Sequence, residues 1–210
     1  MQATSTTEVV QDDIGQDFAD LAMAGPDVAC DIETSGLDWR ADQIGTFQMA
    51  LPSGQVQVVQ FRGRGEPKRL IGVLEQATTQ KVFHHAPFDL RFMMASWNVT
   101  PANIACTKIA SKILEPNVPS SAHSLKPLLE RHLQVRISKE QQISNWTDPN
   151  LTESQITYAI ADVAHLLDLR QVLVSSCASG GLTDELLASW VYLPTRAKLD
   201  LSGAGDVFAY

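Results

Sequence analysis

Two carboxylates stand two positions apart in the stretch VACDIETSGLD, residues 28–38. Asp31 and Glu33 follow a short apolar run that resembles a buried strand, and alternate residues of a strand point to the same side. The two carboxylates therefore lie together at the C-terminal end of this strand. Because like charges held so close repel one another, the pair indicates a cation between them. A solvated strand edge is the alternative interpretation.

Two further acidic residues stand in largely apolar surroundings. Asp89 lies in FHHAPFDLRFM, where an ordinary aspartate of the first helical turn is the alternative. Asp162 lies in ITYAIADVAHLLDL, four positions after Tyr158, so a helix places the phenol and the carboxylate on one face. Burial of an unpaired carboxylate is costly. Four acids in such settings together predict a metal site.

The motifs DIETSGLD, HHAPFDL and YAIAD, in this order, resemble the Exo I, Exo II and Exo III motifs of the DEDD exonuclease superfamily. Tyr158 stands where another branch has histidine, so the chain resembles the DEDDy branch, which includes ribonuclease D. The segment 123–146 is similar to ribonuclease D, and the tail is similar to that of short stand-alone relatives such as nano-RNase C. The resemblance implies an α/β, ribonuclease H-like fold, a five-stranded mixed sheet flanked by helices.

The resemblance also implies a 3′-to-5′ exonuclease that uses two divalent cations, Mg²⁺ or Mn²⁺, which carboxylate oxygens suit. Asp31 would bridge both ions, Glu33 and Asp162 would hold the ion with the attacking water, and Asp89 would support the second ion. Tyr158 would orient that water, since a phenol with an ordinary pKa near 10 is a poor base.

Four residues are candidate substrate contacts. Leu37 directly follows the turn after the first two carboxylates, and the resemblance implies that it contacts the terminal base; packing within the turn is the alternative. His123, Ser124 and Lys126 stand at the start of a predicted helix and could meet substrate phosphate, or could form a solvated face. Trp146 lies in a polar stretch, and we expect it to pack rather than to stack on a base.

The elements that must position these residues follow from hydrophobic spacing. Short apolar or alternating segments predict strands at 28–33, 44–51, 56–61 and 81–86, with a hairpin at 51–56. Helical spacing predicts helices at 66–77, 87–97, 107–115, 123–133 and 182–193. A long helix is predicted from Thr152 to about Ser176, because its TESQ start has capping-box spacing. Strands followed by helices fit a mixed sheet flanked by helices.

Length and composition predict one domain. The chain has 210 residues, of which 44% are hydrophobic and 19% charged, so residues 1–210 are expected to form a single exonuclease domain. Residues 1–14 are expected to be flexible, and residues 200–210 to form a C-terminal tail. No apolar run approaches the roughly 18 to 20 residues of a membrane span, and the N-terminus lacks a signal-peptide pattern. We expect a cytoplasmic protein that does not contact a membrane.

The acidic balance bears on the substrate. A formal net charge of −8 argues against a protein that holds long nucleic acid mainly by phosphate neutralisation. We expect an exoribonuclease that releases nucleoside 5′-monophosphates from RNA, above all from short oligonucleotides, with single-stranded DNA as a further substrate class. Trimming of longer structured RNA and a non-catalytic nucleic-acid-binding module are the alternatives. The apolar tail residues Val207, Phe208 and Tyr210 predict a homo-oligomer, and packing of the tail onto its own subunit is the alternative.

Overall fold

The computed structural model describes residues 6–63, 65–138 and 140–209. Within these residues, one mixed sheet contains six strands in the order β1-β4-β3-β2-β5-β6. The strands are β1 (Thr7–Gln11), β2 (Asp27–Thr34), β3 (Ile44–Ala50), β4 (Val56–Gln60), β5 (Gln80–Phe83) and β6 (Ile104–Cys106). The helices are α1 (Gln16–Ala24), α2 (Lys68–Glu75), α3 (Ala86–Trp97), α4 (Thr107–Leu114), η1 (Ser120–His123), α5 (Leu125–Leu133), α6 (Glu153–Ala164), α7 (Leu166–Ser179) and α8 (Thr183–Ser202).

The expected ribonuclease H-like α/β architecture is confirmed, but the sheet has six strands rather than five. Strands β2, β3 and β4 form an antiparallel meander, and β5 and β6 continue the sheet parallel to β2. The additional strand β1 pairs in parallel with β4. Residues 7–11, expected to be flexible, are therefore an edge strand, whose mostly exposed side chains leave no hydrophobic signal. Residues 1–5 of that segment lie outside the described residues.

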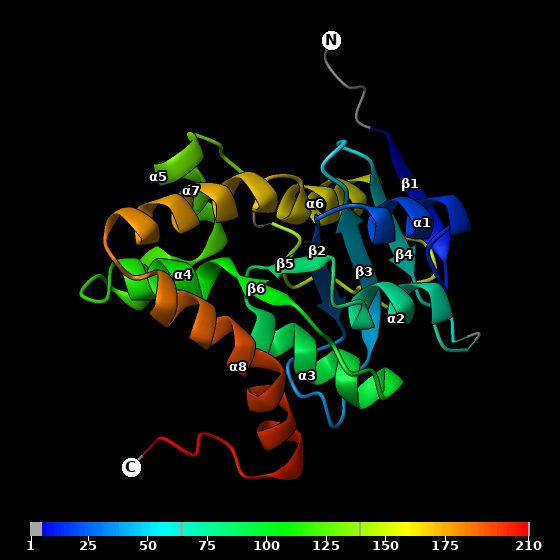
Figure 1. Ribbon diagram of the computed structural model, residues 1–210. Helices are drawn as coiled ribbons and strands as arrows, with labels where there is room; N and C mark the ends of the chain where they lie inside the picture. The colour runs from blue at the N-terminus through cyan, green and yellow to red at the C-terminus, as the bar shows by residue number, and fades with distance from the viewer. Residues whose placement is uncertain (1–5, 64, 139, 210) are drawn as a thin grey trace.

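Helices cover both faces of the sheet. Helix α6 packs on β2, β3 and β4, and α7 packs on β2 and β5. Phe47 of β3, which lies opposite Ile32 and so points away from the face of Asp31, packs against Trp97 of α3. Figure 1 shows α6 and α7 on one side of the sheet, with α3 and α8 on the other. Residues of α6 and of α3, one helix from each side, line the candidate site at the end of β2.

Helix α6 begins with the predicted capping box. The Oγ1 atom of Thr152 accepts a hydrogen bond from the Gln155 backbone N–H at 3.2 Å, and Gln155 Oε1 accepts one from the Thr152 N–H at 2.9 Å. The single helix predicted from Thr152 to Ser176 is instead two, α6 and α7, because the backbone at His165 (φ −119°, ψ 6°) leaves the helical region. Neither proline nor glycine marks this break in the sequence.

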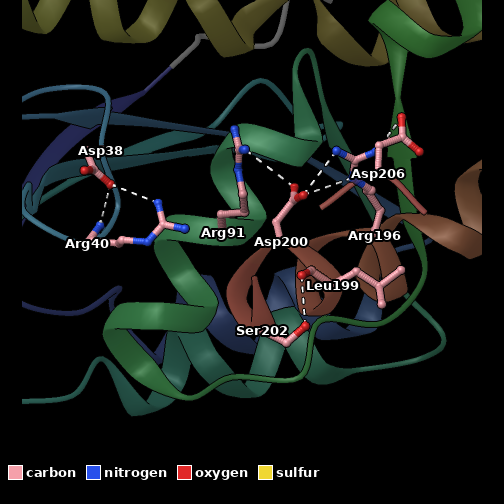
Figure 2. Close-up of polar contacts among 8 residues, drawn as sticks. All are labelled: Asp38, Arg40, Arg91, Arg196, Leu199, Asp200, Ser202 and Asp206. Carbon is pink, nitrogen blue, oxygen red and sulfur yellow. Dashed lines mark hydrogen bonds and ion pairs between the residues drawn. The ribbon is translucent and has the colours of Figure 1, made fainter. Parts of the chain in front are cut away.

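Helix α8 runs to Ser202, beyond the predicted end at residue 193, although Pro194 lies inside it. Figure 2 shows how ion pairs hold the extra turns: Asp200 lies between Arg91 of α3, at 3.5 Å, and Arg196, at 3.1 Å. Arg196 also pairs with Asp206 at 3.0 Å, which draws the start of the tail back to the helix. These contacts join the end of α8 to α3, and the tail begins at residue 203.

The core lies between the sheet and the two helical layers. All three cysteines are buried and unpaired, as small core residues are expected to be. Trp146 is buried, so the expectation that it packs is confirmed. None of the helices in the described ranges is long and apolar enough to cross a membrane.

Candidate active site

The C-terminal half of β2 places two carboxylates on one face of the sheet. Asp31 and Glu33 lie opposite Gln48 and Thr46 of β3, with their side chains on the same side. Helix α6 crosses this face and brings Tyr158 and Asp162, one turn apart, over the strand end. Both carboxylates of β2 and both residues of α6 line a cleft of about 470 Å³, and Asp89 completes it.

Three carboxylates converge inside the cleft. Asp31, Glu33 and Asp162 each offer an oxygen atom, and these atoms lie within 4.8 Å of one another. Negative charges at this separation repel one another unless a cation lies among them. Hard carboxylate oxygens are the donors that Mg²⁺ and Mn²⁺ prefer, so the three residues fit a divalent cation. The expected metal ligands are therefore brought together from two distant parts of the sequence.

Asp89 enters the cleft from the opposite helical layer. It lies in the first turn of α3, directly after β5, and is buried. Burial raises the pKa of its carboxyl to about 8, while backbone hydrogen bonds to its own N–H and to that of Ile32, and the nearby Arg91, oppose this rise. Ionisation of this buried carboxyl is costly unless a cation lies beside it. The position of Asp89 therefore fits a ligand of a second metal ion.

Tyr158 lies between the carboxylates and a buried aromatic ring. Its ring packs against Trp146, with 5.8 Å between the ring centroids. Burial raises the pKa of the phenol well above its ordinary value, and the neighbouring Asp162 and Glu33 raise it further. The hydroxyl group therefore keeps its proton at neutral pH and can donate or accept a hydrogen bond in the cleft without acting as a base.

The rim of the cleft contains one expected residue and one that the sequence reasoning missed. Leu37 is 84% exposed on the turn between β2 and β3, and Ile143 is 96% exposed on the connection between α5 and α6. Both line the cleft. The signal for Ile143 is slight: it is a lone aliphatic residue in the polar stretch SKEQQISN.

The candidate phosphate contacts, at the end of η1 and the start of α5, lie outside this cleft lining. His123 is buried, and its Nδ1 atom lies 2.7 Å from Ser111 Oγ, so the ring is held inside the fold. Ser124 and Lys126 are exposed, and the side chain that enters the cleft from α5 is that of Leu125, between them. The structure therefore does not bring His123, Ser124 or Lys126 together with the carboxylates.

Cations gather at one side of the cleft. His85 lines the cleft beside Asp89, and its pKa is lowered to about 4 by burial and then by Lys108, Arg91 and Lys112. The imidazole is therefore neutral at physiological pH. Within a protein of net charge −8, these three basic residues provide a local positive field at His85.

The chain is similar in sequence to known nucleases. The sequence profile of the 3′-5′ exonuclease family matches residues 7–177. Ribonuclease D of Desulfotalea psychrophila is 30% identical over 133 residues, which cover 63% of this chain and 35% of the relative. The chain thus spans less than half of the length of the ribonuclease D relatives that match it, from 25% to 46%.

Solved structures match over the whole chain. The structure of Brucella melitensis NrnC bound to pGG superposes with a TM-score of 0.90 at 31% identity, covering 99% of this chain and 100% of that one. Brucella melitensis NrnC with bound Mg²⁺ gives a TM-score of 0.89 at 31% identity, covering 98% and 99%. The structural likeness includes α8, which lies beyond the residues that the family profile matches.

Proposed function

Since this chain belongs to the 3′-5′ exonuclease family, we propose that it is a metal-dependent 3′-to-5′ exoribonuclease that releases nucleoside 5′-monophosphates. One observation carries the proposal: four carboxylates and a tyrosine, from three separate parts of the sequence, line a single cleft. A module that only binds nucleic acid, the first alternative, has no need of this set. Phosphodiester hydrolysis does need such a set, because the reaction requires an oriented water molecule and stabilisation of charge on the leaving oxygen.

We propose two cation sites in this cleft, for Mg²⁺ or Mn²⁺. Asp31, Glu33 and Asp162 would hold one ion, and Asp31 together with Asp89 would hold the other. Bound divalent ions acidify a water molecule and stabilise charge on the leaving oxygen. Three observations support this: the spacing of the carboxylate oxygens, the position of Asp89, and the Mg²⁺ in the structure of NrnC.

Tyr158 is proposed to position the attacking water. Its raised pKa keeps the phenol protonated, so the hydroxyl group can hold the water in line with the scissile bond but cannot remove its proton. The contact with Trp146 restricts the ring, which favours one orientation of the hydroxyl group. Positioning of the nucleophile is therefore the part of catalysis assigned to this residue.

Short oligonucleotides, of about two to five residues, are the proposed substrates. The charge of −8 disfavours binding through many phosphate contacts outside the cleft, and among the described basic residues Lys108, Lys112 and Arg91 act on its side near His85. A volume of about 470 Å³ is in the range of sites for small ligands. The binding of pGG by NrnC supports the same choice.

The second alternative is trimming of longer structured RNA. The similarity to ribonuclease D favours it. Recognition of RNA over single-stranded DNA depends on contacts with the 2′-hydroxyl group, so DNA is retained as a further candidate substrate.

Substrate length tests these functions. We would measure kcat/KM for a 5′-labelled dinucleotide and for an oligonucleotide of about 20 residues, at about 50 and 200 mM salt. The Asp31→Asn variant, purified in parallel, controls for contaminating nucleases. We expect the dinucleotide to be preferred, with a shallow salt dependence. A tenfold preference for the longer RNA with a steep salt dependence would favour trimming, and no hydrolysis of any substrate would refute the enzyme.

A homo-oligomer is proposed from different residues. Helix α8 exposes Leu187 and Val191, and the tail exposes Val207 and Phe208; the Phe208 ring packs against Tyr192 in a tilted arrangement with 5.7 Å between centroids. Apolar side chains gathered on one exposed element often mark a protein interface. Light scattering at micromolar concentration should give a multiple of the chain mass; a monomeric mass would contradict the proposal. A cytoplasmic location is also proposed, because the three unpaired, buried cysteines suit a reducing compartment.

A further inference from the structure

Two aliphatic side chains stand in water at the rim of the cleft. Leu37 and Ile143 come from different connections, and both are far more exposed than core aliphatic residues. A single exposed aliphatic residue needs no explanation. Two of them beside four carboxylates do, because an apolar contact in a site for a polyanion serves its bases rather than its phosphates.

The turn that carries Leu37 is held by one carboxylate. Asp42 Oδ1 accepts a hydrogen bond from Ser35 Oγ at 3.0 Å, and Asp42 Oδ2 accepts one from the Asp38 backbone N–H at 3.0 Å. Ser35 Oγ in turn accepts a hydrogen bond from the Gln43 N–H at 3.1 Å. The exposed side chain of Leu37 therefore projects from a fixed turn.

Gly36 allows this carboxylate to approach. A Cβ atom at position 36 would lie 2.4 Å from an oxygen atom of Asp42, closer than any real contact. The turn is thus packed tightly against the carboxylate, which limits the freedom of the adjacent Leu37 backbone. A rigid turn loses little conformational entropy when its side chain contacts a ligand.

The connection that carries Ile143 is held in the same way by an amide. Gln155, buried in the first turn of α6, donates hydrogen bonds from Nε2 to Ser144 Oγ at 3.2 Å and to the Asn145 carbonyl at 3.0 Å. The next residue, Trp146, is buried. Ile143 therefore directly precedes a stretch that is fixed to the helix of the catalytic tyrosine.

We propose that Ile143 is a substrate-binding residue that packs on the face of a substrate base, as a partner to Leu37. The inference rests on the proposed exonuclease function. Every base has an apolar face, so such a contact tolerates any sequence but requires a base at that position. It also adds affinity that does not depend on phosphate charge, which an acidic protein with few basic residues needs for short substrates.

The test combines substitutions with substrates that lack a base. We would determine KM and kcat for wild type, Ile143→Ala and Ile143→Leu on a dinucleotide and on its two abasic forms. Leu21→Ala, at an exposed leucine on α1, is the matched control. Ile143→Ala is expected to raise KM about 5- to 20-fold with kcat within about twofold of wild type. Ile143→Leu should restore KM, and Leu21→Ala should leave it unchanged.

The abasic substrates identify the contact. The effect of Ile143→Ala should disappear on one of the two, because that substrate has already lost the base in question. A wild-type KM for Ile143→Ala, or an undiminished effect on both abasic forms, would overturn the base contact while leaving the exonuclease in place. A wild-type protein that hydrolyses none of the substrates would refute the proposed function, and the contact with it.

Discussion

Trp146 packs against Tyr158 with 5.8 Å between their ring centroids and an angle of 46° between their planes. Trp146 lies in the connection between α5 and α6, and Tyr158 lies in the second turn of α6. Together with Val58 and Ala159 they form a small separate apolar cluster on the face of the carboxylates. The tryptophan thus fixes the ring of the tyrosine, and the hydroxyl group is left to face the cleft.

Tyr158→Phe should separate catalysis from folding. The substitution removes the hydroxyl group but keeps the ring that packs on Trp146, so thermal stability and Mg²⁺ affinity should stay near wild type. Turnover should fall about 10- to 1,000-fold, because the water loses its positioning group. Steady-state kinetics and calorimetric Mg²⁺ titration would measure the two effects. Equal turnover in both proteins would show that the hydroxyl group has no part in the reaction.

Gly45→Ala should disturb the site from the sheet beneath it. A Cβ atom at this position of β3 would lie 2.3 Å from the carbonyl oxygen of Trp146, so the connection must move. We expect a loss of about 1–3 kcal/mol in the free energy of unfolding. Turnover should also fall, because a shift of Trp146 displaces the Tyr158 ring that packs against it.

The matched control is Gly72→Ala. Nothing lies within 4 Å of a Cβ atom there, and position 72 is inside α2, so alanine should stabilise the protein by about 0.5–1 kcal/mol. Denaturant unfolding of both variants gives the comparison. Similar stability for Gly45→Ala and wild type would mean that the contact at position 45 yields without cost.

The sequence could predict that the site residues come together, because burying a carboxylate without a partner costs free energy and such carboxylates mark the site. Asp89 and Asp162 stand in apolar stretches, and Asp31 and Glu33 follow a strand, so each needed a partner. Ile143 could not be found in this way, since its role depends on how Gln155 fixes the connection after α5.

The strands could be predicted where buried side chains line a strand of four or more residues, but not at β6, which is buried yet only three residues long, nor at β1. Strands β2 to β5 show buried runs, whereas the side chains of β1 are mostly exposed and only its pairing with β4 defines it. The extension of α8 past Pro194 depends on the ion pairs of Asp200 with Arg91 and Arg196, and Arg91 is distant in sequence. His123 was assigned to the surface, but it pairs with Ser111 inside.

Lys81 should make the stability of the protein depend on alkaline pH. Its buried ammonium group donates hydrogen bonds to the carbonyl oxygens of Gln76, at 2.5 Å, and Thr79, at 2.8 Å. Burial lowers its pKa from 10.5 to about 8, an effect that the nearby Cys30 opposes. Between these two values the unfolded chain binds more protons than the folded one, so the free energy of unfolding rises with pH.

The free energy of unfolding should rise by at most about 1.4 kcal/mol per pH unit because of this group. This dependence on pH should disappear below a pH of about 8, where Lys81 is protonated in both states. Lys81→Met removes the titrating group, so urea unfolding of the variant should show a shallower slope between pH 8 and 10 than wild type. Parallel slopes for the two proteins would show that the pKa of Lys81 is not lowered in the folded state.

Asp31→Asn should raise the stability of the metal-free protein but lower the rate of hydrolysis. In wild type, the carboxylates of the cleft repel one another without a cation, so Mg²⁺ or Mn²⁺ should raise the melting temperature and EDTA should abolish hydrolysis. Asp31→Asn removes one of the repelling charges. The metal-free variant should therefore melt above metal-free wild type, gain less from Mg²⁺, and retain less than about a few per cent of the wild-type rate.

Glu66→Gln serves as the control for this experiment, because it removes an exposed carboxylate from the loop before α2 and leaves the cleft intact. It should match wild type in its response to Mg²⁺ and in rate. Scanning calorimetry with and without Mg²⁺, combined with hydrolysis of a dinucleotide, measures both properties on the same samples. Undiminished hydrolysis in excess EDTA would refute the metal mechanism, and a Mg²⁺ response of Asp31→Asn equal to that of wild type would remove Asp31 from the ligands. The two outcomes are independent, so the assignment of the central ligand can fail while the dependence on metal stands.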